Sequence, residues 1–266
     1  MLRLASFNVQ SARTATGGYD ASALARSVRA LDADLVALQE VDHGLARSGE
    51  HDQVADIVAA LNADGDQWTG HFLPTLLGSP NLFRTWRPAV ATDLPPGDPA
   101  YGIALVTRLP VHEWHALRLG TFWGRLPMLV PTPRGRMVLL LVPDEPRAAI
   151  AAVVETEVGV MTVIGTHLSF LPLRAPQQLR RIVDWSRTLP GPRILLGDLN
   201  LPGAVPQRIS GWRRLADVAT YPAHRPRSQL DHALADGLER WHPVDVGATR
   251  GEVSDHLALV VDLSRQ

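Results

Sequence analysis

Asp198 and Asn200 are two oxygen-bearing side chains that stand two residues apart, directly after the short apolar run 194–196. Side chains at positions i and i+2 of a strand point to the same face, so this pair could face one bound group. Gly197 would let the backbone come close to that group, because it carries no Cβ. Asp and Asn are also common turn residues after a strand, so the pair alone does not establish a site.

Five other polar signals share this arrangement, in which an apolar run carries a polar group at one of its ends. They are Asn8, Glu40, His167, the pair Asp231 and His232, and the pair Asp255 and His256. Each has an ordinary explanation, since such residues also serve as turn residues, solvated acids, half-buried histidines or helix caps. Ligand and catalytic groups gather at strand ends, where a rigid sheet meets solvent. Their joint occurrence therefore predicts one polar site.

Hydrophobic periodicity predicts the elements that position these residues. Helical spacing predicts helices over residues 24–31, capped by Asp20, over 54–61, before Gly65, and over 179–183, after Pro176. Apolar runs predict strands at residues 2–8, 35–39, 102–107, 150–155, 160–167, 193–196, 229–233 and 256–262. The runs 150–155 and 160–167 are close enough to predict a hairpin. Strands both alternate with helices and follow one another, which predicts a mixed α/β or α+β fold.

Two long stretches, residues 71–100 and 119–146, are rich in Pro and Gly and are predicted to be irregular. They carry the aromatic residues Phe83, Trp86, Phe122 and Trp123. Loops of this length are commonly functional, but their aromatic side chains can also pack within the loop, and both interpretations stay open. No Pro/Gly/Ser linker divides the chain and no repeat is visible, so we expect one domain over residues 1–266.

Composition limits the chemistry that the chain can perform. It contains no cysteine, so disulfides and thiolate metal sites are excluded, and any metal must have O and N ligands. All 26 basic residues are arginine, which excludes Schiff-base and P-loop lysine chemistry. The net charge of −1 disfavours binding of long nucleic acid through cationic contacts. No apolar run reaches the roughly 18 residues of a membrane span and no signal segment is recognisable, so we expect a cytoplasmic protein. We also expect it to be a monomer.

Seven short motifs occur in the order in which they stand in a known superfamily. They are Ser6-Phe7-Asn8, Gln39-Glu40, the run Tyr101 to Arg108, Gly165-Thr166-His167, Gly197 to Asn200, Leu230-Asp231-His232 and Ser254-Asp255-His256. With these motifs, from residue 6 to about residue 262, the chain resembles the endonuclease/exonuclease/phosphatase superfamily, which has the DNase I-like fold. The resemblance implies a four-layer α/β sandwich, in which two mixed β-sheets pack face to face between outer helices. It also implies one site at an edge of the sheets and hydrolysis of phosphate esters with Mg²⁺ or Mn²⁺.

The resemblance also implies roles for the acids and amides. Glu40 is the expected main metal carboxylate, and Asn8 and Asp255 help directly or through water. Hard oxygen ligands of this kind suit Mg²⁺. Asp198 is expected to orient or deprotonate the attacking water. Asn200 is expected to donate its amide N–H to a phosphoryl oxygen and so to contact the substrate.

The remaining candidates are imidazoles and their partners. His256 and Asp231 match an imidazole–carboxylate pair, in which His256 acts either as a base or as a cationic phosphate contact. His167 matches a second histidine that assists at the phosphate or leaving group. Arg147 is a weaker candidate for a phosphate contact, and His232 is expected only to pack beside Asp231.

The substrate is open at this level, because the superfamily hydrolyses DNA, RNA tails, inositol phosphates and sphingomyelin. A metal-dependent phosphodiesterase or nuclease is the first hypothesis. A phosphomonoesterase or a phospholipid or inositol-phosphate hydrolase is the alternative. His167 and Gln10 argue against an abasic-site repair enzyme, which has other residue types at these positions. A non-catalytic binding module would have lost some of the site residues, and the sequence retains them.

Overall fold

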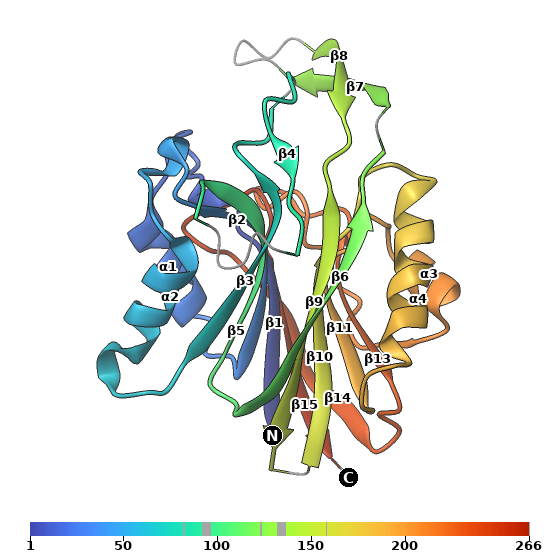
Figure 1. Ribbon diagram of the computed structural model, residues 1–266. Helices are drawn as coiled ribbons and strands as arrows, with labels where there is room; N and C mark the ends of the chain where they lie inside the picture. The colour runs from blue at the N-terminus through green and yellow to red at the C-terminus, as the bar shows by residue number, and fades with distance from the viewer. Residues whose placement is uncertain (82, 92–96, 123, 132–136, 158, 266) are drawn as a thin grey trace.

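The computed structural model describes residues 1–81, 83–91, 97–122, 124–131, 137–157 and 159–265, so Trp123 lies outside the described residues. Two β-sheets pack face to face and helices cover their outer faces (Figure 1). The four-layer sandwich that the family resemblance implies is therefore confirmed.

The first sheet has seven strands in the order β14-β15-β1-β2-β5-β3-β4. Strands β1 and β2 are parallel, and all the other pairs are antiparallel. The bounds are β1 (Leu2–Asn8), β2 (Leu35–His43), β3 (Thr69–Leu77), β4 (Arg87–Pro88), β5 (Ala100–Thr107), β14 (Trp241–Thr249) and β15 (Ala258–Arg265).

The second sheet has six strands in the order β12-β13-β11-β10-β9-β6, and its β10–β11 pair is parallel. The bounds are β6 (Val111–Gly120), β9 (Arg147–Thr156), β10 (Gly159–His167), β11 (Arg193–Asp198), β12 (Arg213–Arg214) and β13 (Asp231–Asp236). Strands β9 and β10 form the predicted hairpin. A separate two-stranded sheet, β7 (Arg125–Pro131) and β8 (Met137–Pro143), projects beyond the sandwich (Figure 1).

Helices α1 (Ala21–Arg29) and α2 (Gln53–Leu61) cover the first sheet, whereas α3 (Arg174–Ser186) and α4 (Val205–Ser210) cover the second (Figure 1). Short 3₁₀ turns stand at Gln10–Ala12, Ala46–Ser48 and Asn62–Asp64. The carboxylate of Asp20 accepts a hydrogen bond from the backbone N–H of Ala23 at 2.8 Å, which confirms the predicted cap of α1. No described helix has both the length and the apolar character needed to cross a membrane.

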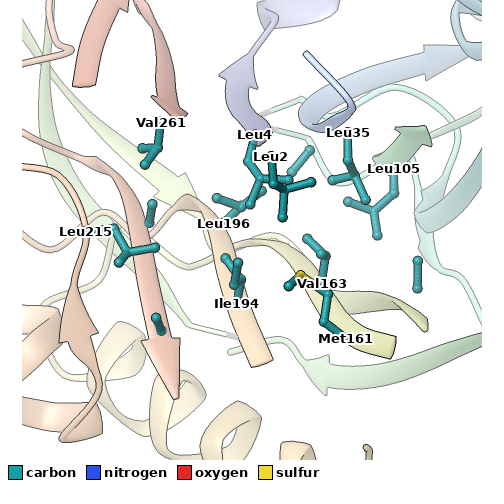
Figure 2. Packing of buried hydrophobic residues seen from close by; sticks show 14 of the residues in the cluster. Leu2, Leu4, Leu35, Leu105, Met161, Val163, Ile194, Leu196, Leu215 and Val261 are labelled. Atoms are coloured by element: carbon teal, nitrogen blue, oxygen red, sulfur yellow. The ribbon is translucent and has the colours of Figure 1, made fainter. Parts of the chain in front are cut away.

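The core between the sheets is built from aliphatic side chains of both layers (Figure 2). Leu4 and Leu35 of the first sheet and Val163 and Ile194 of the second belong to one buried cluster. Two further clusters lie outside this core. One lies between the first sheet and its helices, and the other lies between the second sheet and its helices. Both faces of each sheet are therefore buried, and the edges where strands end are the places for polar groups.

The structure departs from the sequence prediction at several elements. The sequence does not predict strands β3, β4, β6, β7, β8, β12 and β14 or helix α4. The stretches 71–100 and 119–146 are not simply irregular, because they contain much of β3, the strand β4 and the whole β7–β8 hairpin. The prediction failed because prolines and continuous apolar runs hide the alternation of a half-buried strand.

The described aromatic residues of these stretches differ in burial. Trp86 is buried with Leu45, Leu76 and Tyr101, so it packs its own loop. Phe83 and Phe122 are exposed, so neither is buried in its loop as Trp86 is.

Candidate active site

The predicted site residues converge on one edge of the sandwich because of strand direction. Carboxyl ends of parallel strands meet at the same edge, where antiparallel neighbours begin. The register of β10, β11 and β13 places His167, Asp198 and Asp231 side by side on adjacent strands. From the facing sheet, β1 ends at Asn8, whose register partner on β2 is Gln39, the residue before Glu40.

A cavity of about 430 Å³ opens between these strand ends. The predicted residues in its wall are Glu40, Arg147, His167, Asp198, Asn200, Asp255 and His256. Asn8 and Asp231 are buried beneath the wall, where they contact residues that line it. The structure thus brings all the predicted site residues together in one place.

Glu40 enters this site through a break in the strand. A β-bulge lies between Gln39 and Val41 opposite β5, and Glu40 has a φ of 58°, in the left-handed region. Bulges re-aim side chains, and strained backbone of this kind gathers at functional sites. Burial raises the pKa of the Glu40 carboxyl to about 7, although a hydrogen bond from Asn8 Nδ2 at 3.1 Å opposes this shift. The surroundings of the half-buried Glu40 therefore compensate its negative charge only in part.

Asn8 joins the two sheets at the site. Its Nδ2 donates to Glu40 Oε1 and to Asp198 Oδ2, both at 3.1 Å, and its Oδ1 accepts from the backbone N–H of Gln10 at 3.2 Å. One amide thus sets the separation of two carboxylates that come from different layers.

Asp198 lies at the centre of the site. Its Oδ1 accepts the backbone N–H of Asn200 at 2.9 Å, and its Oδ2 is 3.7 Å from Nε2 of both His167 and His256. Burial, followed by the charge of Asp231, raises the pKa of Asp198 to about 6 against the opposing charge of His256. Asp198 can therefore take up a proton close to neutral pH.

Asn200 reaches the cavity by a different route from the predicted one. Strand β11 ends at Asp198, and Asn200 has a φ of 51°, so a turn rather than strand periodicity places it beside Asp198. Its Nδ2 donates to the carbonyl of Leu168 at 3.0 Å and lies 3.3 Å from His167 Nε2. Gly197 is required for a different close approach, since a Cβ there would lie 2.0 Å from the carbonyl oxygen of Thr166 on β10.

His256 is held as a cation. Its Nδ1 lies 2.9 Å from Oδ2 of the fully buried Asp231. Burial alone would lower the pKa of His256, but the charge and hydrogen bond of Asp231 outweigh it and raise the pKa to about 10. The ring of Tyr221 packs against this imidazole with the ring centres 4.8 Å apart.

His167 has the opposite charge state. Arg147 Nη1 lies 3.0 Å from His167 Nδ1. A guanidinium only donates, so Nδ1 must accept and the proton of the neutral ring is on Nε2. Burial, with the charges of Arg147 and His256, lowers the pKa of His167 well below its usual value. His167 therefore presents a neutral Nε2–H to the cavity.

Arg147 is 5% exposed, and its Nη2 is 3.4 Å from Glu145. Its contacts with His167 and Glu145 place it behind the imidazole as well as in the cavity wall. Its predicted contact with a phosphate stays a prediction. His232 is outside the site, because it is buried with Nε2 2.8 Å from the carbonyl of Leu201.

Several residues of the site were not singled out from the sequence. Arg47 lines the cavity and is fixed by the buried Asp42, whose carboxylate accepts its Nε at 2.8 Å and its Nη2 at 2.6 Å. Tyr221 and Glu145 also line the cavity. Arg47 and Tyr221 follow no apolar run, so strand-end reasoning gives no signal for them.

The donor atoms of the site fit a divalent cation. Asp198, Asp231 and His256 are buried and offer ligand atoms within 4.8 Å of one another, an arrangement consistent with metal binding. Glu40 offers a second position, since it is a half-buried, partly compensated carboxylate in the same cavity as Asp255. Both positions are rich in the oxygen donors that hard cations prefer.

A two-sheet sandwich with a buried Asp/His cluster at one edge is a phosphoesterase scaffold, and the comparisons with known proteins agree. The model of the Endonuclease/Exonuclease/phosphatase family matches residues 5–256. The chain therefore belongs to this family of hydrolases. No curated protein matches the sequence significantly.

Solved structures with the same fold are distant in sequence. An endonuclease/exonuclease/phosphatase from Beutenbergia cavernae is 21% identical, with a TM-score of 0.69 over 99% of this chain and 71% of that chain. The mannosyl-6-phosphatase of Bacteroides thetaiotaomicron is 15% identical, with a TM-score of 0.62 over 99% and 100%. The human Nocturnin catalytic domain is 15% identical, with a TM-score of 0.60 over 100% and 94%. At these identities the similarity supports the fold alone.

Proposed function

We propose that the protein is a divalent-metal-dependent phosphodiesterase. The observation that carries this proposal is the position of Asp198 Oδ2, 3.7 Å from Nε2 of both His167 and His256. A carboxylate that titrates near neutral pH stands there between one neutral and one cationic imidazole. Hydrolysis of a phosphate ester needs a base for water, positive charge for the phosphoryl oxygens and a hydrogen-bond donor for the leaving oxygen.

In this proposal each side chain has a task that its surroundings support. Asp198 accepts the proton of the attacking water, because its raised pKa makes it a stronger base than an ordinary aspartate. The His256 cation stabilises negative charge on the phosphoryl group, and Asp231 keeps it protonated. His167 donates Nε2–H to the leaving oxygen or to a phosphoryl oxygen. Asn200 contributes its amide as a further donor.

Glu40, with Asn8 and Asp255, would hold Mg²⁺ or Mn²⁺. Such an ion neutralises charge on the phosphoryl oxygens when it is bound. We prefer Glu40 over the group of Asp198, Asp231 and His256, because the protonated His256 has no free lone pair for a metal. The raised pKa of Glu40 supports this choice, since a nearby cation would remove the cost of its buried charge.

A phosphomonoesterase is the second candidate, because a similar solved structure is described as a mannosyl-6-phosphatase. The test is hydrolysis of bis-p-nitrophenyl phosphate and of p-nitrophenyl phosphate, each with Mg²⁺, with Mn²⁺ and with EDTA. We expect faster diester hydrolysis that EDTA abolishes. A preference for the monoester would favour the second candidate, and activity that survives EDTA would contradict the metal dependence. A screen of plasmid DNA, RNA, inositol phosphates and sphingomyelin would then identify the substrate class.

Asp198→Asn tests the central residue in the same assay. We expect it to lower the rate by about 10²–10⁴-fold, the usual size of an acid–base contribution. Asp184→Asn is the matched control, because Asp184 is an exposed partner of Arg187 on α3, away from the cavity wall. Equal activity of the two variants would remove Asp198 from the mechanism.

A further inference from the structure

Arg47 is a cation that a buried carboxylate holds in the wall of the cavity. Asp42 of β2 is fully buried and accepts Nε of Arg47 at 2.8 Å and Nη2 at 2.6 Å. Nη2 also donates to Ser11 Oγ at 2.9 Å. The guanidinium lies over the ring of Tyr101, which lines the same cavity, with Cζ 5.4 Å from the ring centre. The orientation of Arg47 is therefore fixed before a ligand binds.

A second layer of buried polar groups fixes the carboxylate in turn. Ser11 Oγ donates to Asp42 Oδ1 at 2.9 Å, and Ser48 Oγ donates to Asp42 Oδ2 at 2.8 Å. The fully buried Gln53 accepts the backbone N–H of Asp42 and donates to the carbonyl of Ser11, both at 2.9 Å. Each oxygen of Asp42 thus has two donors, so the carboxylate cannot turn away from Arg47 without losing hydrogen bonds.

Strained backbone brings Ser11 into this network. Gln10, Ser11 and Ala12 have φ angles of 47°, 56° and 67°, in the left-handed region that residues other than glycine rarely adopt. Such strain persists only where the surroundings over-determine it, and it gathers at ligand-binding sites. The turn therefore indicates that the position of Ser11, and of the Arg47 that it contacts, serves a function.

Arg47 keeps two N–H donors for a ligand. A guanidinium has five N–H groups, and these contacts use three of them, the one on Nε and both on Nη2. Within the described part of the chain Nη1 has no hydrogen-bond partner, and it is not one of the buried unpaired polar atoms, so solvent reaches it. Because Arg47 lines the cavity, its Nη1 can donate to a molecule bound there.

The surroundings of Nη1 favour an anion. The exposed Arg13, directly after the strained turn, also lines the cavity and adds positive charge. The planar donor fork of arginine matches the oxygens of phosphate. Ser11 Oγ, which contacts Arg47, lies 3.3 Å from the carbonyl oxygen of Glu40, so this cation stands beside the expected metal carboxylate. It belongs to the first sheet, whereas His167 and Asp198 belong to the second.

We propose that Nη1 of Arg47, supported by Arg13, forms a subsite for a second anionic group of the substrate. The protein would then select phosphodiesters that carry a further phosphate. Nucleotides and inositol phosphates both offer such a group, whereas the head group of sphingomyelin carries a cation instead. The subsite stands on the geometry around Arg47, and its part in substrate selection rests on the proposed function.

The test compares ligands that differ by one phosphate. Calorimetry uses Asp198→Asn with Mg²⁺, so that no turnover occurs. It compares thymidine 3′,5′-bisphosphate with thymidine 5′-phosphate, and inositol 1,4-bisphosphate with inositol 1-phosphate. We expect the bisphosphate to bind about tenfold tighter in at least one pair, because hydrogen bonds to charged groups are strong, and that pair identifies the source of the second phosphate. Equal affinities in both pairs would overturn the subsite. Arg47 is intact in this comparison, so the result does not depend on whether a variant of Arg47 folds.

Arg47→Lys, made in the same background, assigns the preference to Arg47. Lysine keeps a positive charge for Asp42 but lacks the donor fork, so the preference should fall to within about twofold. Arg26→Lys is the matched control, because Arg26 on α1 is also held by two hydrogen bonds to one carboxylate, that of Glu252, and lies outside the described cavity wall. It should keep the preference. The same preference in both lysine variants would refute the role of Arg47.

Kinetics separate the subsite from the proposed function. In the unmodified protein, a preference in the nucleotide pair should give thymidine 3′-phosphate 5′-(p-nitrophenyl phosphate) a KM about tenfold lower than that of the ester without the 3′-phosphate. If no phosphate ester is hydrolysed while a bisphosphate keeps its advantage in calorimetry, the proposed function is refuted and the subsite stands. Ester hydrolysis with equal affinities in both ligand pairs would overturn the subsite and leave the proposed function in place.

Discussion

The position of the metal ion can be decided by the pH dependence of its binding. Burial raises the pKa of Glu40 to about 7, so an ion held by Glu40 must displace a proton below that pH. Its affinity should then be constant above pH 7 and fall tenfold for each pH unit below it. Between about pH 7 and pH 5 the loss is roughly 100-fold, or about 2.7 kcal/mol.

The group of Asp198, Asp231 and His256 predicts a different profile. An ion held there must displace the proton of His256, whose pKa is raised to about 10. The affinity would then keep rising tenfold per pH unit through the whole range from neutral pH to about 10. Calorimetric titration with Mg²⁺ across this range therefore distinguishes the two positions.

Two variants complete this experiment. Glu40→Gln keeps the size of the side chain and removes its charge, so it should weaken Mg²⁺ or Mn²⁺ binding by at least about 100-fold and abolish the step at pH 7. Asp198→Asn should leave the affinity within about tenfold, because it changes only a neighbouring charge. The reverse pattern, with binding lost in Asp198→Asn and kept in Glu40→Gln, would refute the assignment of the ion to Glu40.

Three further perturbations address the groups around this centre. Asp231→Asn should lower the pKa of His256 from about 10, visible in its imidazole NMR signals, and cost about 10²–10⁴ in kcat. The stability lost in this variant should be largest below pH 6.5 and should vanish as the pH rises through 10, where folded His256 loses its proton. Arg147→Met should release Nδ1 of His167, shift its tautomer in ¹⁵N NMR and lower kcat about tenfold or more. Gly197→Ala should lower the free energy of unfolding by about 2–4 kcal/mol in chemical denaturation, because its Cβ meets a backbone carbonyl.

Matched variants show whether these effects are specific. Gly203→Ala also changes a glycine with positive φ, but nothing lies within 4 Å of its new Cβ, so it should cost only about 1 kcal/mol. Arg181→Met removes an arginine that donates to the carbonyls of Leu119 and Arg118 and should leave kcat unchanged. Equal stability of the two alanine variants, or equal kcat of the two methionine variants, would contradict the roles given to Gly197 and Arg147.

The sequence predicted the buried strands and the convergence of the site, because both follow from local patterns. Continuous apolar runs marked β1, β2, β10 and β11, and a polar residue stood at the end of each. Once parallel pairing is assumed, these ends must share an edge. Local patterns predict the start of a strand less well. The sequence predicts a strand that starts at residue 229, whereas β13 begins at Asp231.

The remaining features depend on contacts that no local pattern contains. The bulge at Glu40 is defined only against β5, and the need for Gly197 arises from the backbone of β10. Arg147 is predicted to contact the substrate rather than His167, because the predicted strand starts at residue 150 and leaves Arg147 outside the β9–β10 hairpin that brings the two together. The β7–β8 hairpin is not predicted, because its residues alternate in no hydrophobic pattern.

The two histidines show how one residue type acquires two functions in this site. Both place Nε2 at 3.7 Å from the same oxygen of Asp198, so distance to the centre does not distinguish them. The partners of their Nδ1 atoms distinguish them. Nδ1 of His256 faces the carboxylate of Asp231, which stabilises the cationic ring. Nδ1 of His167 faces the guanidinium of Arg147, which stabilises the neutral ring. At neutral pH the site thus contains one positive imidazole for developing charge and one neutral N–H donor. If both were cations, they would repel each other across Asp198 and lower its pKa, which would weaken the base that the reaction needs.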